Sequence, residues 1–415
     1  MGEYGRRWPQ ALAAVLLLAL LAALGGGAGP PGERRTAHDA VRALLDTQAA
    51  AVHAGDAERY LSHVDPAAPR YRAAQQRAFR NLGALPLAEW SYEITGLRLD
   101  GGRAAAEVRL RHRLRGYDRA PRTSVEKLDL VRRDGRWYVA GERRGSARQL
   151  WEQGRVTTVR GSRSLVLSTL ADRKVLRGVA RAADRAVPAV SAAWPRPWPE
   201  RLVVLVPASV RGMGELLGAS ADAYAGIAAV TSSQSAGRRA SGGGPGRAAP
   251  ADRVVVNPEA YGLLSREGRQ VVMTHETTHV AARSHTTAAT PLWLSEGLAD
   301  WFGYRGTGRP ARQAAPELAR AVYAERIPRA LPTDEDFGFD NGAAVLARAY
   351  EGSWLACRMI AERWGERALM TLYTAVGRHA DGGPKTTDRA LRAVLGVGTR
   401  EFTAQWRGYL RSELG

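Results

Sequence analysis

Apolar residues in the first part of the chain recur with a helical period. In residues 36–55, Val41, Leu44, Leu45 and Val52 fall on one face of a helix with 3.6 residues per turn. Two shorter stretches continue this pattern, so helices are predicted over 36–55, 56–63 and 69–82.

The period then changes to alternation, with residues that favour strands. Four strands are predicted, over 90–99, 103–114, 124–131 and 136–140. Asp134-Gly135 between the last two is a strong signal for a hairpin. Helices followed by a curved antiparallel sheet make an α+β unit.

A second group of elements begins near residue 155. The pattern predicts a β-like stretch over 155–167, a largely helical stretch over 171–194, and apolar strands over 201–207, 226–231 and 253–257. Residues 232–252 are rich in Ser, Gly, Arg and Pro, and we expect a flexible loop there because nothing in them can form a core. Helices are then predicted from Ser265, from Thr290-Pro291 and over 342–364.

The length of 415 residues exceeds the usual domain size of about 100 to 200 residues. We therefore predict a leader and linker over 1–35, an α+β domain over 36–150 and a second domain over 151–415. The second domain is expected to combine a small sheet with a helical C-terminal part.

The N-terminus has the parts of a secretory signal. Arg6 and Arg7 precede an unbroken apolar run over 11–24, which a Gly- and Pro-rich stretch follows. The run is shorter than the roughly 20 residues that normally cross a bilayer, so a cleaved signal peptide and an uncleaved signal anchor both stay open. In either case we expect the protein outside the cytoplasm, secreted or anchored to the membrane.

The formal net charge of +19 invites a comparison with nucleic-acid-binding proteins. Nearly all the positive charge is Arg, however, and it is spread along the whole chain, so no specific nucleic-acid site is indicated. Ordinary solvated charge and attraction to an anionic membrane or wall surface remain as alternatives. The sequence leaves the oligomeric state open.

One predicted helix carries a candidate metal site. His275 and His279 are four residues apart, which is about 400° of helix, so both imidazoles project from one face and can grip one ion. Glu276 lies about 100° further round, where it can reach a water beside the ion as a general base. The only cysteine, Cys357, excludes a site built from several thiolates.

Two candidates exist for the third ligand. His285 would extend the motif to His-Glu-x-x-His-x-x-Ala-x-x-His, which differs from the metzincin pattern because Ala282 stands where that pattern has Gly. Glu296 lies on the next predicted helix, and Asp300 shares its face. One carboxylate can then bind the ion while the other accepts the free ring N–H of a ligating His.

The second arrangement resembles a known family. Thr274-His275-Glu276-Thr277-Thr278-His279 and Trp293-Leu294-Ser295-Glu296-Gly297-Leu298-Ala299-Asp300 resemble the gluzincin metallopeptidases, specifically the peptidase-MA-like family. The resemblance implies a zincin-like fold in which His275, His279 and Glu296 bind Zn²⁺. It also implies that Glu276 is the general base and that Asp300 orients His275. Two imidazoles, one carboxylate and an open position are the usual catalytic zinc set.

Hydrolysis at such a site needs a donor for the developing oxyanion. Gluzincins generally supply a Tyr or His from a downstream segment, and Tyr350 lies in the predicted helix over 342–364. A core position is the alternative for Tyr350, and His285 is the other candidate donor. The strands over 226–231 and 253–257 are expected to offer a sheet edge to an extended peptide.

The α+β domain has a resemblance of its own. It closes with Val131-Arg132-Arg133-Asp134-Gly135-Arg136-Trp137-Tyr138-Val139, and in this it resembles the nuclear-transport-factor-2-like (SnoaL-like) cone. Such cones often hold a ligand pocket. No convergent set of acid and base side chains is visible in this part of the sequence, so packing or spacing is the other expected role.

Taken with these resemblances, the sequence predicts an exported zinc metallopeptidase that acts on a protein or peptide substrate. The alternative is a non-catalytic envelope-associated binding protein that uses the NTF2-like domain to recognise a ligand or partner. The cleavage preference cannot be read from the sequence.

Overall fold

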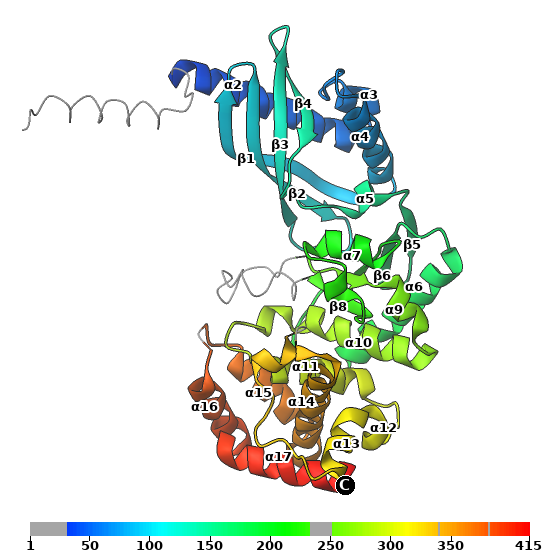
Figure 1. Ribbon diagram of the computed structural model, residues 1–415, viewed down its shortest axis with the longest axis vertical. Coiled ribbons are helices and arrows are strands. Elements are labelled where there is room, and N and C mark those ends of the chain that lie inside the picture. The colour runs from blue at the N-terminus through cyan, green and yellow to red at the C-terminus, as the bar shows by residue number, and fades with distance from the viewer. Residues whose placement is uncertain (1–30, 233–250, 339–340, 381) are drawn as a thin grey trace, which may run out of the picture. The chain divides into compact units, whose positions relative to one another are not determined.

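The computed structural model describes residues 31–232, 251–338, 341–380 and 382–415 (Figure 1). The described residues form two compact units, each discontinuous in sequence: 31–80, 89–112 and 123–146 make the first, and 81–88, 113–122 and the described part of 147–415 make the second. Helices and sheets occur together, so the predicted mixed fold is confirmed.

The first unit has a four-stranded sheet with helices beside it (Figure 1). Its elements are α2 (Pro31–Ala54), α3 (Ala57–Leu61), α4 (Pro69–Leu82), β1 (Leu87–Asp100), β2 (Arg103–Leu114), β3 (Arg122–Arg133) and β4 (Arg136–Glu142). The strands are neighbours in chain order.

The predicted hairpin is confirmed. β3 and β4 pair antiparallel with Arg133 opposite Arg136, so only Asp134 and Gly135 form the turn. Both have positive φ, which is what a two-residue turn between twisted strands requires. The register shifts between Asp129 and Leu130, and such a bulge bends the sheet locally.

The helical face predicted for α2 forms the core of this unit. Val41, Leu44 and Leu45 are buried and pack with inward-facing residues of the sheet such as Val108 and Leu130. Every second residue of β2 is buried, as its alternating sequence predicts. Each such aliphatic side chain contributes about 1.5–3 kcal/mol by leaving water.

The second unit contains a five-stranded sheet and most of the helices. Its elements are α5 (Leu150–Gln153), β5 (Thr157–Arg160), β6 (Ser164–Ser168), α6 (Arg173–Ser191), β7 (Leu202–Val206), α7 (Val210–Leu217), η1 (Asp222–Tyr224), β8 (Ala229–Thr231), β9 (Val254–Val256), α9 (Pro258–Leu263), α10 (Arg266–Ala282), η2 (Arg283–His285), α11 (Leu292–Tyr304), α12 (Ala311–Ala314), α13 (Pro316–Tyr323), η3 (Asp334–Phe337), α14 (Ala343–Trp364), α15 (Glu366–Val376), α16 (Pro384–Leu395) and α17 (Thr399–Leu414).

The strand order of this sheet is β5-β6-β7-β9-β8. β6, β7 and β9 run parallel, whereas β8 pairs antiparallel with β9 and occupies the edge. Successive side chains along a strand point to opposite faces of the sheet, and both faces are apolar. Val204 and Val254 pack with α6 and α10 on one face, while Val255 packs with α7 and η1 on the other. The edge strand β8 contacts α10.

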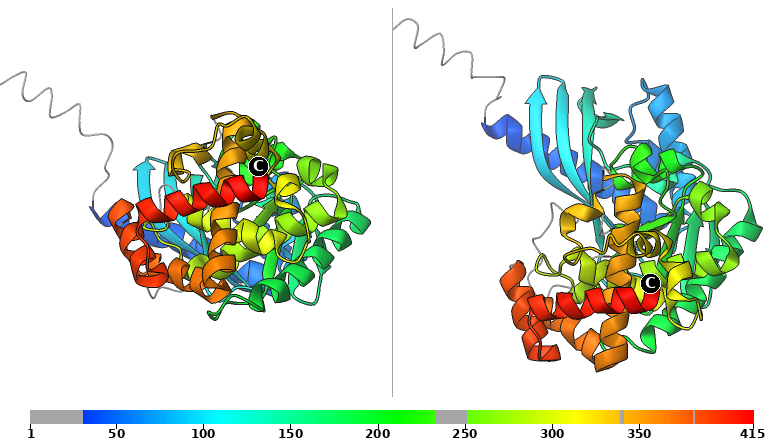
Figure 2. Two further views of the ribbon diagram at one scale, coloured as in Figure 1. Left: turned by 90° about the horizontal axis from the view of Figure 1, so that it is seen from below. Right: turned by 60° about the horizontal axis from the view of Figure 1, so that its bottom comes forward.

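Helices α10, α11 and α14 pack closely because two glycines allow it. A Cβ at Gly303 of α11 would lie 3.1 Å from the Val271 carbonyl oxygen of α10. A Cβ at Gly297 would overlap the Ser353 carbonyl oxygen of α14. Figure 2 shows the C-terminal helix α17 in red crossing α14, which it contacts.

The expected membrane anchoring needs a correction. No helix in the described parts of the chain is long and apolar enough to cross a membrane. The apolar run over 11–24, from which we expected a signal or anchor, lies outside the described residues, as does most of the predicted loop over 232–252.

Candidate metal centre

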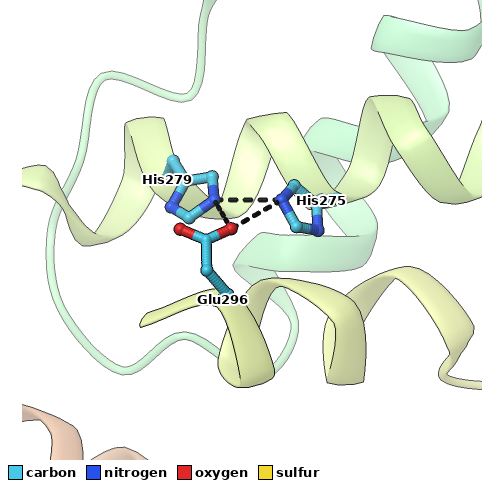
Figure 3. A group of neighbouring side chains, drawn as sticks. All are labelled: His275, His279 and Glu296. Carbon is cyan, nitrogen blue, oxygen red and sulfur yellow. Dashed lines mark hydrogen bonds and ion pairs between the residues drawn. The ribbon is translucent and has the colours of Figure 1, made fainter. Parts of the chain in front are cut away.

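Helix α10 presents the two candidate imidazoles as its sequence predicts. The helix begins after Ser265, whose hydroxyl accepts the N–H of Gly268, and it continues past the metal motif to Ala282. His275 and His279 lie one turn apart on the same side, and Glu296 of α11 faces them (Figure 3).

Three donor atoms converge at this point. The Nε2 atoms of His275 and His279 are 3.1 Å apart. Oε2 of Glu296 lies 3.3 Å from the first and 3.4 Å from the second. His279 and Glu296 are buried, and the side chain of His275 is 12% exposed. The three atoms therefore form a nearly equilateral triangle screened from bulk water.

The triangle has the size that a small tetrahedral cation requires. Zinc bonds to nitrogen and oxygen of about 2.0–2.2 Å place neighbouring ligand atoms about 3.3–3.6 Å apart. The three observed separations are close to this value. The residues present thus fit a zinc ion, and three protein ligands are the number that catalytic zinc sites use beside a fourth, exchangeable position.

Neighbouring side chains fix the orientation of two of these donors. Oδ1 of Asp300 lies 2.7 Å from Nδ1 of His275, so Nδ1 carries the proton and Nε2 is turned toward the centre. The Ser295 hydroxyl donates to Oε1 of Glu296 at 3.3 Å, while Oε2 faces the imidazoles. The orientations of the His275 ring and of the Glu296 carboxylate are therefore each set by a hydrogen bond at the atom that does not face the centre.

The charges around the centre perturb these groups strongly. Burial opposes the ionised form of Glu296, but the adjacent His279 and His275 outweigh it and hold the pKa of that carboxyl well below its usual value. Burial likewise opposes a charged His275, but Asp300 and Glu296 raise its pKa well above the ordinary value. The negative charge of the carboxylates thus dominates the electrostatic potential at the centre. This potential favours a cation there, and binding of a metal cation would displace protons from the nitrogens that become ligands.

Glu276 lies beside the triangle and has a partner that the sequence did not indicate. The hydroxyl of Thr231, at the end of the edge strand β8, donates to Oε2 of Glu276 at 2.7 Å. Both residues are buried. Nothing local marks Thr231, because its relation to Glu276 depends on how β8 packs on α10.

Tyr350 also lies at the centre. Its ring centroid on α14 is 6.3 Å from that of His275, and the Phe337 ring packs against it in a T-shaped arrangement. Burial raises the pKa of Tyr350 well above its ordinary value, and the carboxylates of Glu296, Asp300 and Glu276 raise it further. The phenol therefore stays protonated and can donate a hydrogen bond.

His285, the other candidate ligand, has different neighbours. It ends the short helix η2, and its ring lies 5.9 Å from that of Trp194. Among the described residues, the donor atoms that come together are those of His275, His279 and Glu296 only. The structure thus brings Glu296, Asp300 and Tyr350 to the two imidazoles and leaves His285 out of that group.

The first unit contains a polar network where the sequence showed no convergent set. The Tyr60 hydroxyl donates to Gln75 at 2.7 Å, and the Gln75 amide donates to Glu142 at 3.2 Å. The Tyr71 hydroxyl reaches the same Glu142 oxygen at 3.4 Å. Sequence reasoning missed this network because Glu142 of β4 is more than 60 residues from its partners on α3 and α4, and only packing of the helices against the sheet brings them together.

Comparisons with known proteins give fold similarity only. No family model and no curated protein matches the chain. The chain is similar to the structure of an NTF-2-like protein of unknown function from Shewanella oneidensis MR-1, at 18% identity and a TM-score of 0.21, over 25% of this chain and 95% of the other. It is also similar to a Mycobacterium tuberculosis protein of unknown function, at 15% identity and a TM-score of 0.24, over 30% of this chain and 80% of the other. Of the two resemblances expected from the sequence, only the NTF2-like one has a counterpart among these structures.

Proposed function

We propose that this protein is a zinc-dependent metallopeptidase that hydrolyses peptide bonds in protein or peptide substrates. The observation that carries the proposal is the triangle of His275 Nε2, His279 Nε2 and Glu296 Oε2, whose edges match those of a tetrahedral zinc site. A non-catalytic metal-binding protein would need the triangle and Asp300, which orients His275, but would not need a general base such as Glu276 or a donor such as Tyr350 beside it.

Each surrounding group has a role in hydrolysis. When bound, zinc supplies a Lewis acid that polarises the carbonyl and lowers the pKa of the attacking water. Glu276 takes the proton from that water and returns it to the departing amine. Tyr350, protonated at neutral pH, donates to the oxygen on which negative charge develops. Asp300 keeps His275 in the tautomer that turns Nε2 toward the ion.

The edge strand suggests how a peptide binds. Within the part of the chain that the structure describes, β8 pairs with β9 alone, and it contacts the helix that carries Glu276. An extended peptide adding to the open side of β8 would form main-chain hydrogen bonds that hold a scissile bond near the metal. This mode suits an unfolded or flexible segment better than a folded protein.

The decisive test compares the full chain with a Glu276→Gln variant. Zinc content is measured by mass spectrometry, and hydrolysis is followed with fluorescein-labelled casein. We expect about one zinc per chain in both proteins and a loss of hydrolysis of about 10²-fold or more in the variant, because only the base is removed. Glu267→Gln, in the exposed first turn of the same helix, serves as the matched control.

The ligand assignment is tested in the same measurement. Glu296→Ala should lose zinc and His285→Ala should keep it; the reverse would overturn the assignment. Wild-type protein that holds no zinc and cleaves no unfolded substrate would refute the peptidase proposal. Protein that holds zinc but cleaves nothing would favour the binding-protein alternative.

A further inference from the structure

The buried contact between Thr231 and Glu276 is not explained by the zinc ligands or their orienting groups. Thr231 is the last residue of β8 and is fully buried. Its hydroxyl lies 2.7 Å from Oε2 of Glu276 and 3.3 Å from the carbonyl oxygen of the same residue. A hydroxyl has one proton, so the shorter contact with the carboxylate is the hydrogen bond.

The backbone holds this hydroxyl in place. Thr231 pairs with Val254 of β9, and the next residue, Ser232, donates its N–H to the Arg253 carbonyl oxygen at 2.8 Å. The side chain is β-branched, so few χ1 rotamers are open to it. The donor is therefore presented to Glu276 at low cost in side-chain entropy.

The contact distinguishes the two oxygens of the carboxylate. A donor fixed on Oε2 leaves Oε1 as the atom free to take and return a proton. It also limits rotation of the carboxyl group, and a general base works only within hydrogen-bond reach of the proton that it abstracts. Hydrogen bonds to a carboxylate are stronger than those between neutral groups.

We propose that Thr231 is a positioning residue for the general base: its hydroxyl fixes Oε2 of Glu276 so that Oε1 performs the proton transfer. This inference rests on the proposed function. Thr231 lies on β8, the strand that we propose binds the peptide. The same strand would therefore both bind the substrate and orient the general base.

The test uses the full-length Thr231→Val and Thr231→Ser variants. Valine keeps the shape and removes the hydroxyl, whereas serine keeps the hydroxyl and removes the methyl group. We expect Thr231→Val to lower kcat on labelled casein by about 10- to 100-fold, as loss of outer-shell partners does, with KM and zinc affinity within about twofold of wild type. Thr231→Ser should recover most of kcat. Thr374→Val is the matched control, because it also removes a buried threonine hydroxyl, but one that donates to a helix carbonyl oxygen.

A readout independent of activity is the position of Glu276 in crystals of both variants. The carboxylate should move or take several positions in Thr231→Val and keep one position in Thr231→Ser. An unmoved Glu276, an unchanged kcat, or equal losses in both variants would overturn the inference. If the wild type proves inactive, the peptidase proposal fails, and an ordered carboxylate that moves only in Thr231→Val still supports the positioning role.

Discussion

Asp300 determines which nitrogen of His275 points at the candidate metal position. The 2.7 Å contact between Oδ1 and Nδ1 is short, and it lies on the side of the ring opposite Nε2. A ligand held in this way needs no reorientation when an ion binds.

Replacing Asp300 by Asn should therefore weaken metal binding without abolishing it. We expect zinc affinity to fall by about 10- to 100-fold, because the amide supports the required tautomer less well than the carboxylate. Competition with a chromophoric chelator measures the change. Glu267→Gln on the same helix should have wild-type affinity; a wild-type value for Asp300→Asn would contradict the proposed orienting role.

Tyr350 is the candidate hydrogen-bond donor to the oxyanion. Because its phenol stays protonated, Tyr350→Phe removes one donor and little volume. We expect kcat to fall by about 10²–10³-fold with zinc content unchanged, as loss of an oxyanion donor does. Tyr304→Phe, at another partly buried tyrosine close to Asp300, should leave kcat within a few fold. Equal effects of the two changes would assign Tyr350 to packing.

At the scale of elements, the position of Glu296 depends on how closely α11 approaches α14. Gly297 follows Glu296 directly, and a Cβ there would overlap the Ser353 carbonyl oxygen and lie 2.8 Å from Cys357 Sγ. The backbone of α14 cannot yield without breaking its own hydrogen bonds, so α11 would have to shift.

Gly297→Ala should accordingly lower both stability and zinc content, although alanine has the higher helix propensity. The expected cost is about 1–3 kcal/mol, as for overpacking of a core. Thermal unfolding and metal analysis measure the two effects. Gly268→Ala in α10 is the control, because its Cβ would have no neighbour nearer than 3.5 Å. A Gly297→Ala protein as stable as this control would show that α11 can move freely.

At the scale of the whole molecule, the second unit depends on residues that precede its main segment. Asp118, between β2 and β3, forms a two-bond ion pair with Arg253, with both distances 2.7 Å and both side chains at most 3% exposed. Asn81 likewise donates to the carbonyl oxygens of Trp151 and Gly154. Burial and the nearby Arg253 lower the pKa of Arg122 to about 10, so this region holds two crowded guanidinium groups.

Asp118→Ala should therefore be strongly destabilising, because it leaves Arg253 buried without its carboxylate. We expect the free energy of unfolding, from urea titration, to fall by about 3–5 kcal/mol. Asp129→Ala, which breaks an exposed pair with Arg143, should cost about 0–1 kcal/mol. A fragment starting at residue 147 lacks both Asn81 and Asp118, and its stable folding would contradict this account.

Local patterns alone determined most of the elements. The period of apolar residues predicted α2, α4, β1 to β4 and α10, and Asp134-Gly135 predicted the β3–β4 turn. These features depend on neighbours in the chain, which the sequence displays directly. The shared face of His275 and His279 follows from the same helix geometry.

Contacts between distant segments were decided only by the tertiary structure. The sequence left His285 and Glu296 open as third ligand, and packing of α11 on α10 placed Glu296 against the two imidazoles. It gave no sign of Thr231 beside Glu276 or of Asp118 beside Arg253. Such pairs depend on which surfaces of separate elements meet. Which surfaces meet is determined by the packing of all core residues together, so it cannot be read from any local stretch of the sequence.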